Sequence, residues 1–199
     1  MTTADGQQQV RPDTTALAGP SRWTLDAARS SVTLRHKTMW GLVTVRGAFG
    51  DLAGQAEIGA DGSARGRLEI GAASLDTRNA KRDKHLRSAD FFNADEHPHI
   101  VAVLQRADLA GGTDPAGRTG LAGRTGAAGD PVTVTGQLTA AGITRPLSFT
   151  ATLEEVTESA VTVRAEAEID RAQFGMTWNQ LGMLRGPATI SVVARFTRA

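Results

Sequence analysis

Short runs that alternate apolar and polar residues follow one another from Trp23 to the C-terminus. A period of two is typical of β-strands with one buried face, because successive side chains point to opposite sides of a strand. The pattern predicts about eight or nine strands, counting 53–58 as a short strand and 100–107 as a less regular one. The positions that share a face within each run are Val32, Leu34 and His36; Val43, Val45, Gly47 and Phe49; Gly66, Leu68 and Ile70; Val132, Val134, Gly136 and Leu138; Leu147, Phe149, Ala151 and Leu153; Val161, Val163, Ala165, Ala167 and Ile169; and Ile190, Val192, Ala194 and Phe196.

Turn residues separate these runs, as at 60–63 (Ala-Asp-Gly-Ser) and 140–142 (Ala-Ala-Gly), which favours hairpins and antiparallel pairing. One open sheet of this size has two exposed edges, and closure into a barrel removes them. A barrel of about eight strands can hold one small ligand inside. We therefore expect an all-β, antiparallel barrel.

The alternation does not by itself say which face of the barrel is apolar. An outer-membrane barrel has the same period with the faces exchanged. The chain has no tyrosine and only three tryptophans, too few for two aromatic girdles. An apolar interior is therefore expected.

Two segments interrupt the alternation. Residues 110–131 are rich in Gly, Ala and Thr and repeat Ala-Gly-Arg-Thr-Gly at 116–120 and 122–126, which predicts a disordered, flexible insert. Residues 76–95 lack a period of two, and we expect one short helix there, with an N-cap at Asp76 or Thr77.

The ends and the overall composition narrow the class of protein. A length of 199 residues fits one domain, which we place at 23–199 after a disordered tail at 1–22. The tail has no apolar run of the kind a secretory signal needs, so a cytoplasmic protein is expected. No apolar stretch approaches the roughly 18 residues of a membrane-spanning helix, so stable membrane insertion is not expected.

The formal net charge is +1, with 22 basic and 21 acidic residues, which gives no reason to expect nucleic acid or an anionic membrane surface as a partner. The absence of cysteine excludes disulfides, thiolate metal sites and cysteine nucleophiles. Glycine-rich nucleotide loops, nucleophile elbows and zinc helices are also absent.

The histidines offer little metal chemistry. His97 and His99 flank a proline, and surface positions are the commoner role for such a pair. His36 lies on an apolar face, where a core histidine with satisfied ring nitrogens is commoner than a ligand. No metal site is predicted.

Two groups of residues are candidates for a ligand site. Arg82, Asp83 and His85 can form an acid–base pair or a polar clamp on a head group, or else ordinary solvated ion pairs, since neighbouring helical positions point in different directions. The second group can line a cavity, although each member alone is more often simple core; it comprises Phe49, Phe91, Phe92, Phe149, Phe174, Met176 and Trp178.

The sequence resembles the YceI family of polyisoprenoid-binding proteins over nearly all of the chain from Trp23 to Phe196. The resemblance rests on several segments in the family's order rather than on one motif. These are Trp23-Thr24-Leu25-Asp26 with Ser31-Val32 and His36; Val45-Arg46-Gly47-x-Phe49; Thr77-x4-Arg82-Asp83-x-His85-Leu86 with Ser88-x-Asp90-Phe91-Phe92; Val134-x-Gly136-x-Leu138-Thr139; Gly142-x-Thr144-x-Pro146; and Asp170-Arg171-x-x-Phe174-Gly175.

This resemblance implies an extended, eight-stranded, lipocalin-like barrel whose tunnel takes an isoprenoid quinone or a related lipid. It also implies a possible homodimer. Members of the family are often exported, whereas the tail of this chain predicts no export signal. The stretch that contains Arg82, Asp83, His85 and Leu86 is the family's most recognisable one, and these residues either contact the ligand or brace the barrel.

Three hypotheses follow. The first is a non-enzymatic carrier or store of a long apolar lipid, with no cofactor besides the bound isoprenoid-type lipid. The second is an enzyme that acts on an apolar substrate through Arg82, Asp83 and His85. The third is a stress-related interaction module whose interior is solid. An unfilled channel along the barrel axis distinguishes the first hypothesis from the third.

Overall fold

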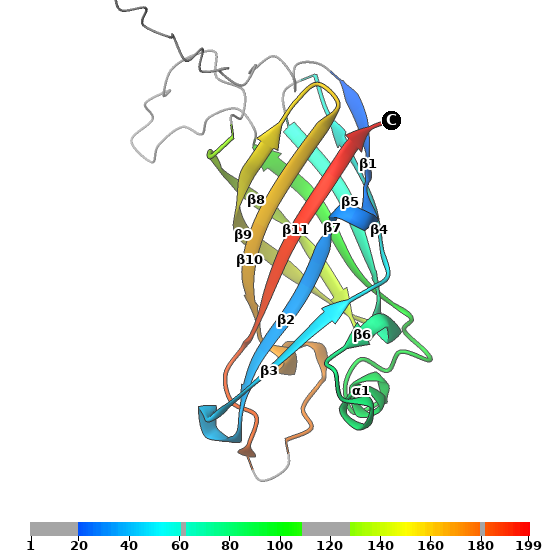
Figure 1. Cartoon of the computed structure of the whole chain (residues 1–199), viewed down its shortest axis with the longest axis vertical. Helices are drawn as coiled ribbons and strands as arrows, with labels where there is room; N and C mark the ends of the chain where they lie inside the picture. The colour runs from blue at the N-terminus through cyan, green and yellow to red at the C-terminus, as the bar shows by residue number, and fades with distance from the viewer. Residues whose placement is uncertain (1–19, 61–62, 109–127, 180–181) are drawn as a thin grey trace, which may run out of the picture.

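The computed structural model describes residues 20–60, 63–108, 128–179 and 182–199, and in this part strands dominate (Figure 1). A single α-helix, α1 (Ala80–Arg87), and short 3-10 helices, among them η2 (Ala27–Arg29), η3 (Met39–Gly41), η4 (Ala72–Ser74) and η5 (Arg171–Phe174), connect them. The strands are β1 (Ser21–Leu25), β2 (Ser31–Thr38), β3 (Val43–Phe49), β4 (Leu52–Ile58), β5 (Ser63–Gly71), β6 (Leu75–Asp76), β7 (His99–Asp108), β8 (Pro131–Ala140), β9 (Ile143–Val156), β10 (Ala160–Ile169) and β11 (Ala188–Arg198).

Eight of the strands form a closed antiparallel ring, in the order β1-β4-β5-β7-β8-β9-β10-β11. Pairing of β1 with β11, in the register Trp23↔Arg198 and Leu25↔Phe196, closes the ring. The all-β barrel expected from the alternation is thereby confirmed. Closure pairs strands that would otherwise be sheet edges.

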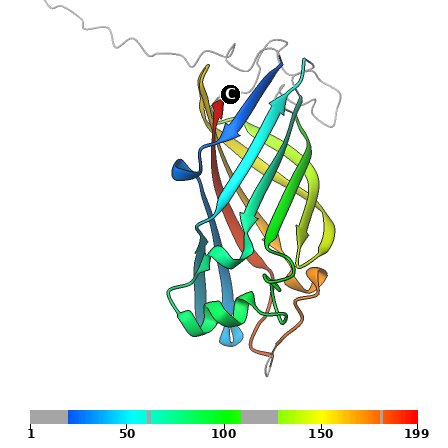
Figure 2. The same ribbon diagram turned by 90° about the vertical axis from the view of Figure 1, so that its right-hand side faces the viewer.

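The remaining strands, β2, β3 and β6, extend the sheet beyond the ring at the lower end of the barrel, the end that carries α1 in Figure 1. We call this three-stranded extension the leaf. Strand β11 pairs with β1 near its C-terminal end and with β2 along Thr189–Val193, so β1 and β2 lie in succession along one edge of β11. From β2 the leaf continues through β3 to β6. Figure 2 shows α1 (green) beside this leaf at the lower end of the barrel.

The inward face follows the sequence alternation closely, and one irregular strand has a local explanation. In β7, Leu104 pairs with Gly136 whereas Arg106 pairs with Thr135, so Gln105 is an extra residue in a β-bulge. Parity therefore changes within the strand: Ile100, Ala102 and Leu104 face inward, and then Ala107 does. This change explains why the alternation in 100–107 looked less regular.

Three boundaries differ from the sequence-based prediction. Strand β1 begins at Ser21, so two residues of the predicted tail, Ser21 and Arg22, pair with β4; residues 1–19 of that tail lie outside the described residues. Strand β8 begins at Pro131, the last residue of the predicted insert, and residues 110–127 of that insert also lie outside the described part of the chain.

The third difference is the start of the helix. Asn79, not Asp76 or Thr77, is the N-cap of α1, and its side chain accepts a hydrogen bond from the Arg82 backbone N–H at 3.0 Å. The two predicted caps have other roles. Asp76 accepts from the Arg78 N–H at 2.7 Å, and the Thr77 side chain bonds to Asp83.

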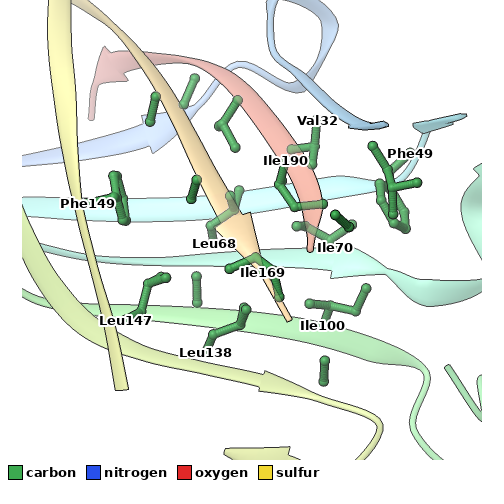
Figure 3. A pocket seen from close by; sticks show the side chains of 18 of the residues that line it. Val32, Phe49, Leu68, Ile70, Ile100, Leu138, Leu147, Phe149, Ile169 and Ile190 are labelled. Carbon is green, nitrogen blue, oxygen red and sulfur yellow. The ribbon is translucent and has the colours of Figure 1, made fainter. Parts of the chain in front are cut away.

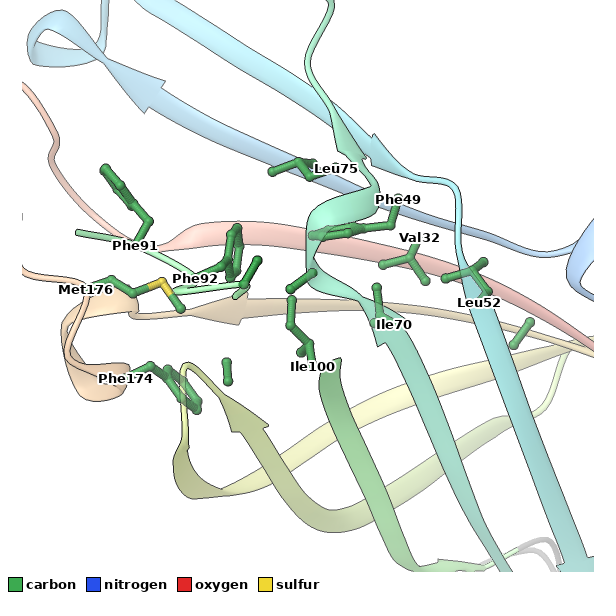
Figure 4. Close-up of a cluster of buried hydrophobic side chains, with 14 of the residues drawn as sticks. Val32, Phe49, Leu52, Ile70, Leu75, Phe91, Phe92, Ile100, Phe174 and Met176 are labelled. Atoms are coloured by element: carbon green, nitrogen blue, oxygen red, sulfur yellow. The ribbon is translucent and has the colours of Figure 1, made fainter. Parts of the chain in front are cut away.

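Buried apolar side chains gather in two clusters, one toward each end of the barrel. The lower cluster contains aromatic residues that lie next to β3 and β6 (Figure 4). Phe49 and Phe92 are in edge contact, with 6.1 Å between ring centroids. The upper cluster contains Trp23, whose ring lies 5.6 Å from the Arg198 guanidinium. In the part of the chain that the structure describes, no helix is long and apolar enough to cross a membrane.

Candidate ligand cavity

An internal cavity of about 760 Å³ runs along the barrel. All eight strands of the ring contribute to its wall, together with β2, β3, α1 and the segment after η5. Figure 3 shows aliphatic and aromatic side chains pointing into it from opposite walls. Its size is in the range of protein cavities that enclose a whole organic ligand, roughly 300–1,000 Å³. Residues that line it and are labelled in Figure 3 include Val32, Phe49, Leu68, Ile70, Ile100, Leu138, Leu147, Phe149, Ile169 and Ile190.

An aromatic cluster forms the lower end of the cavity. The His85 ring on α1 lies edge-on to Trp178, with 4.5 Å between centroids, and edge-on to Phe91 at 5.1 Å. Phe91 and Trp178 are themselves 5.7 Å apart. His85 Nε2 is 3.1 Å from the Asp90 carboxylate, which holds the imidazole from its outer side. These three rings pack against one another, and we call this lower end of the cavity, with its aromatic and basic lining, the mouth.

The Thr77 hydroxyl joins Arg82 and Asp83 into one braced turn. The Asp83 carboxylate is buried and accepts from the Thr77 N–H at 3.0 Å and from the Thr77 hydroxyl at 2.5 Å. Arg82 Nε donates to the Thr77 hydroxyl at 2.7 Å, and its Nη2 donates to the Thr77 carbonyl at 2.8 Å. Asp83 therefore fixes the chain that enters α1, while the neighbouring Arg82 reaches the cavity wall.

Arg171 and His36 shape the other side of the mouth. Arg171 Nη1 donates to the carbonyl oxygens of Met176 and Trp178, the latter at 2.9 Å, and so curls the segment after η5 back under the barrel. Burial lowers the pKa of the Arg171 guanidinium. The His36 ring bonds the Gly186 carbonyl at 3.2 Å, and its pKa is lowered mainly by burial, with a smaller contribution from the Arg171 charge.

The charges around the cavity are of one sign. Among the described residues that line it there is no aspartate or glutamate, and every ionisable side chain is basic. Most are near the lower end; the full set is His36, Arg65, Arg67, Lys81, Arg82, His85 and Arg171. The cavity thus combines a long apolar wall with hydrogen-bond donors at its mouth.

Ten of the eleven residues predicted to form the ligand site line the cavity. The exception is Asp83, whose carboxylate is directed to Thr77. Arg82 and His85 both line the lower end of the cavity, but the Asp83 carboxylate does not join them there. The ten are Phe49, Arg82, His85, Leu86, Phe91, Phe92, Phe149, Phe174, Met176 and Trp178.

The sequence-based prediction did not include Arg171, Lys81, Leu184 or, as a lining residue, His36, all of which lie near the lower end of the cavity. A signal for Arg171 was available, since it precedes Phe174 and Met176 within one short segment. Leu184 had none, because its position depends on mutual hydrogen bonds between the Asn179 side chain and the Leu184 backbone.

His97 and His99 lie in surroundings that do not suggest metal binding. A β-carbon at Gly142, in the β8–β9 turn, would lie 2.6 Å from Cε1 of His97, so the imidazole covers that turn. His99 is exposed at the start of β7. The described residues contain no group of three or more His, Cys, Asp or Glu side chains placed to hold a metal ion.

A closed β-barrel with a long apolar cavity and a polar mouth defines the class of lipocalin-like binding barrels. A family model described as the YceI-like domain matches residues 23–196, so the chain belongs to the YceI-like family. The resemblance inferred from the sequence motifs is confirmed.

Solved structures share this fold at low sequence identity. BcnA of Burkholderia cenocepacia superposes with a TM-score of 0.69 at 20% identity, covering 86% of this chain and 98% of that one. A polyisoprenoid-binding domain from Saccharophagus degradans, implicated in plant cell wall breakdown, gives a TM-score of 0.66 at 17% identity, covering 89% and 98%.

Curated relatives are similar over parts of the chain. A UPF0312 protein of Pectobacterium atrosepticum is 28% identical over 140 residues, which is 69% of this chain and 63% of that protein. Protein YceI of Shigella flexneri is 33% identical over 86 residues, 43% of this chain and 36% of its own length. A UPF0312 protein of Staphylococcus aureus is 27% identical over 80% of this chain and 85% of its own.

Proposed function

We propose that this protein binds a long apolar lipid of the isoprenoid type, a polyisoprenoid or an isoprenoid quinone, and stores or carries it inside the barrel. The observation that carries the proposal is the continuous apolar cavity of about 760 Å³. Membership of the YceI-like family and the fold shared with a polyisoprenoid-binding domain support it.

The energetics favour a long chain over a small metabolite. Each methylene removed from water contributes about 0.8 kcal/mol, so ten carbons contribute roughly 8 kcal/mol. Association costs about 4–15 kcal/mol in lost freedom. A short ligand gains too little apolar contact in this cavity to offset that cost, whereas a chain that extends along the barrel gains enough.

The mouth supports a head group that accepts hydrogen bonds. Arg82 and Arg171 have guanidinium N–H groups beyond those that bond Thr77, Met176 and Trp178, and no acidic side chain lines the cavity among the described residues. The edge-on rings of His85, Phe91 and Trp178 favour a flat group. The carbonyl oxygens and planar ring of a quinone match both features.

The two other hypotheses fit the structure less well. An interaction module with a solid interior does not agree with an unfilled cavity of this volume. An enzyme that uses Arg82, Asp83 and His85 needs all three at the substrate, and the Asp83 carboxylate instead bonds Thr77.

The test is native mass spectrometry of the full chain purified without detergent. A long-chain lipid should remain bound and should be recovered by solvent extraction. The matched variant is Ala165→Trp, which places a large ring at an inward position of β10, and it should carry markedly less of that lipid. Ligand-free protein that also takes up no added isoprenoid quinone would count against the proposal.

A further inference from the structure

The hairpin tip between β2 and β3 exposes a run of apolar side chains, which we call the apolar tip (Met39, Trp40, Leu42 and Val43). In the described part of the chain, five large apolar residues are more than a third exposed, and these are four of them. Leu42 is 85% exposed and Trp40 54%. Apolar side chains gathered in this way at one place mark an interaction site rather than the usual scatter of surface residues.

The backbone holds these side chains outward at a cost. Met39, Trp40 and Gly41 have φ values of 49°, 57° and 94°, all left-handed, and only glycine adopts that region without strain. The Leu42 N–H bonds the Met39 carbonyl at 3.2 Å and closes the turn. A strained turn that exposes a tryptophan and a leucine to solvent indicates that the exposed side chains themselves have a function.

The apolar tip adjoins the mouth of the cavity. Thr38, the residue before it, lines the cavity, as do Lys81 and His85 on α1 and Leu184 in the segment after η5. Figure 1 shows the hairpin tip, α1 and that segment together at the lower end of the barrel. A lipid that enters or leaves at this end passes beside the tip.

The same hairpin is basic on its outer face. Arg35 and Lys37 on β2 and Arg46 on β3 are exposed, and Arg35 lies directly opposite Arg46 in the register. Residues 31–49 contain no aspartate or glutamate, and among the described residues none of these three cations forms a salt bridge. Like charges opposite each other are unfavourable unless something negative lies against them.

We propose that this end of the barrel docks reversibly on an anionic lipid bilayer, with the apolar tip in the interfacial layer and Arg35, Lys37 and Arg46 against anionic head groups. Tryptophan favours the membrane interface, and basic side chains beside apolar ones are the usual device of a surface-bound segment. The mouth then faces the bilayer. This inference rests on the proposed function, because a protein that carries a lipid must take that lipid from a lipid phase.

The charges also argue against the obvious alternative occupant, a second copy of the chain. A symmetric pair of tips brings two sets of Arg35, Lys37 and Arg46 together, and their repulsion opposes association. The net charge of +1 for the whole chain does not reveal this local excess of basic residues in 31–49.

The test is co-sedimentation of the full chain with vesicles of phosphatidylcholine alone or with about a third phosphatidylglycerol. Wild-type protein should bind the anionic vesicles more tightly, and binding should weaken as the screening length falls from ~10 Å at 0.1 M salt to ~3 Å at 1 M. Trp40→Ser with Leu42→Ser should lower affinity at least about tenfold. Val103→Ser, the fifth exposed apolar residue, on the barrel wall, is the matched control and should bind as wild type.

A second variant separates charge from apolar contact. Lys37→Glu with Arg46→Glu should abolish the preference for anionic vesicles while the apolar tip stays intact. Thermal unfolding checks that each variant is folded, and Leu42→Asp alone decides the matter if the double tip variant is not. Equal binding by folded tip variants and wild type overturns the proposal. So does a wild-type protein that ignores vesicles but forms a dimer that the tip variants dissolve.

Cargo and docking are measured separately. The tip variant should still carry lipid in native mass spectra, and Ala165→Trp should still bind vesicles. Loss of lipid binding with intact docking would therefore count against the proposed function alone, and the converse would count against the docking alone.

Discussion

At the scale of single residues, position within a turn decides what a polar side chain does. Arg82 and Asp83 are adjacent in the sequence, yet Arg82 reaches the cavity and Asp83 turns inward to Thr77. Neighbouring residues on a helix point in different directions. Both side chains bond Thr77, but the Asp83 carboxylate is buried against the Thr77 N–H and hydroxyl whereas Arg82 also lines the cavity, and no local sequence pattern reports that difference.

Asp83→Ala tests this bracing role. The substitution leaves the buried Thr77 N–H and hydroxyl without their acceptor, so we expect the free energy of unfolding to fall by about 1–3 kcal/mol. Asp90→Ala is the control: its carboxylate is exposed and, among the described residues, pairs with His85 alone, so its loss should cost less than about 1 kcal/mol. Urea denaturation measures both. Equal stability of Asp83→Ala and wild type would show that the brace contributes nothing.

His36 gives a prediction for pH. Its pKa in the folded chain is lowered from the ordinary value of 6.5, mainly by burial, so the unfolded chain binds more protons near that pH. Stability must then fall as pH drops through 6.5, until the folded-state pKa is passed.

His36→Gln removes this dependence and keeps a donor for the Gly186 carbonyl. Unfolding curves between about pH 7 and pH 5 should show a smaller loss of stability for His36→Gln than for wild type. The exposed His99→Gln serves as the control and should follow wild type. Parallel pH profiles for all three proteins would refute the assignment.

At the scale of elements, the strands were the most predictable part of the chain. Their period of two is a local property of extended backbone, so inward and outward positions could be assigned before any pairing was known. Val43 is the exception on the predicted inward face. It lies at the hairpin tip, beyond the barrel wall, and is 42% exposed.

Gly136 shows how one strand constrains its neighbour. A β-carbon there would overlap the carbonyl oxygen of Val103, next to the bulge in β7. We expect Gly136→Ala to lower the unfolding free energy by about 1–3 kcal/mol, as overpacking usually does. Gly50→Ala is the matched control, because a β-carbon at Gly50 meets nothing within 4 Å. Guanidinium denaturation of both variants gives the comparison, and a neutral Gly136→Ala would contradict it.

At the scale of the whole molecule, the shape of the cavity depends on all eight strands of the ring together. Ala165 on β10 pairs with Val192 and Ala151, midway between Val161 and Ile169. A large side chain at this position should divide the cavity and shorten the longest lipid that the protein retains.

We therefore expect Ala165→Trp to bind short-chain isoprenoid quinones with affinity within about threefold of wild type and to lose the long-chain members of the same series. Glu168→Trp carries the same ring on the outer face of the same strand and should leave the chain-length profile unchanged. Binding assays across the series check this. An unchanged profile for Ala165→Trp would mean that the lipid does not pass this level of the barrel.

The sequence by itself determined the strands and the identity of most inward side chains, because alternation follows from the geometry of a single extended strand. Two things were decided only by the tertiary structure. Opposite walls stand far enough apart to leave an unfilled channel, since that separation follows from the number and tilt of strands in the closed ring. The basic and apolar residues of one hairpin meet the mouth of that channel, since pairing of β2 with the lower part of β11 brings them there.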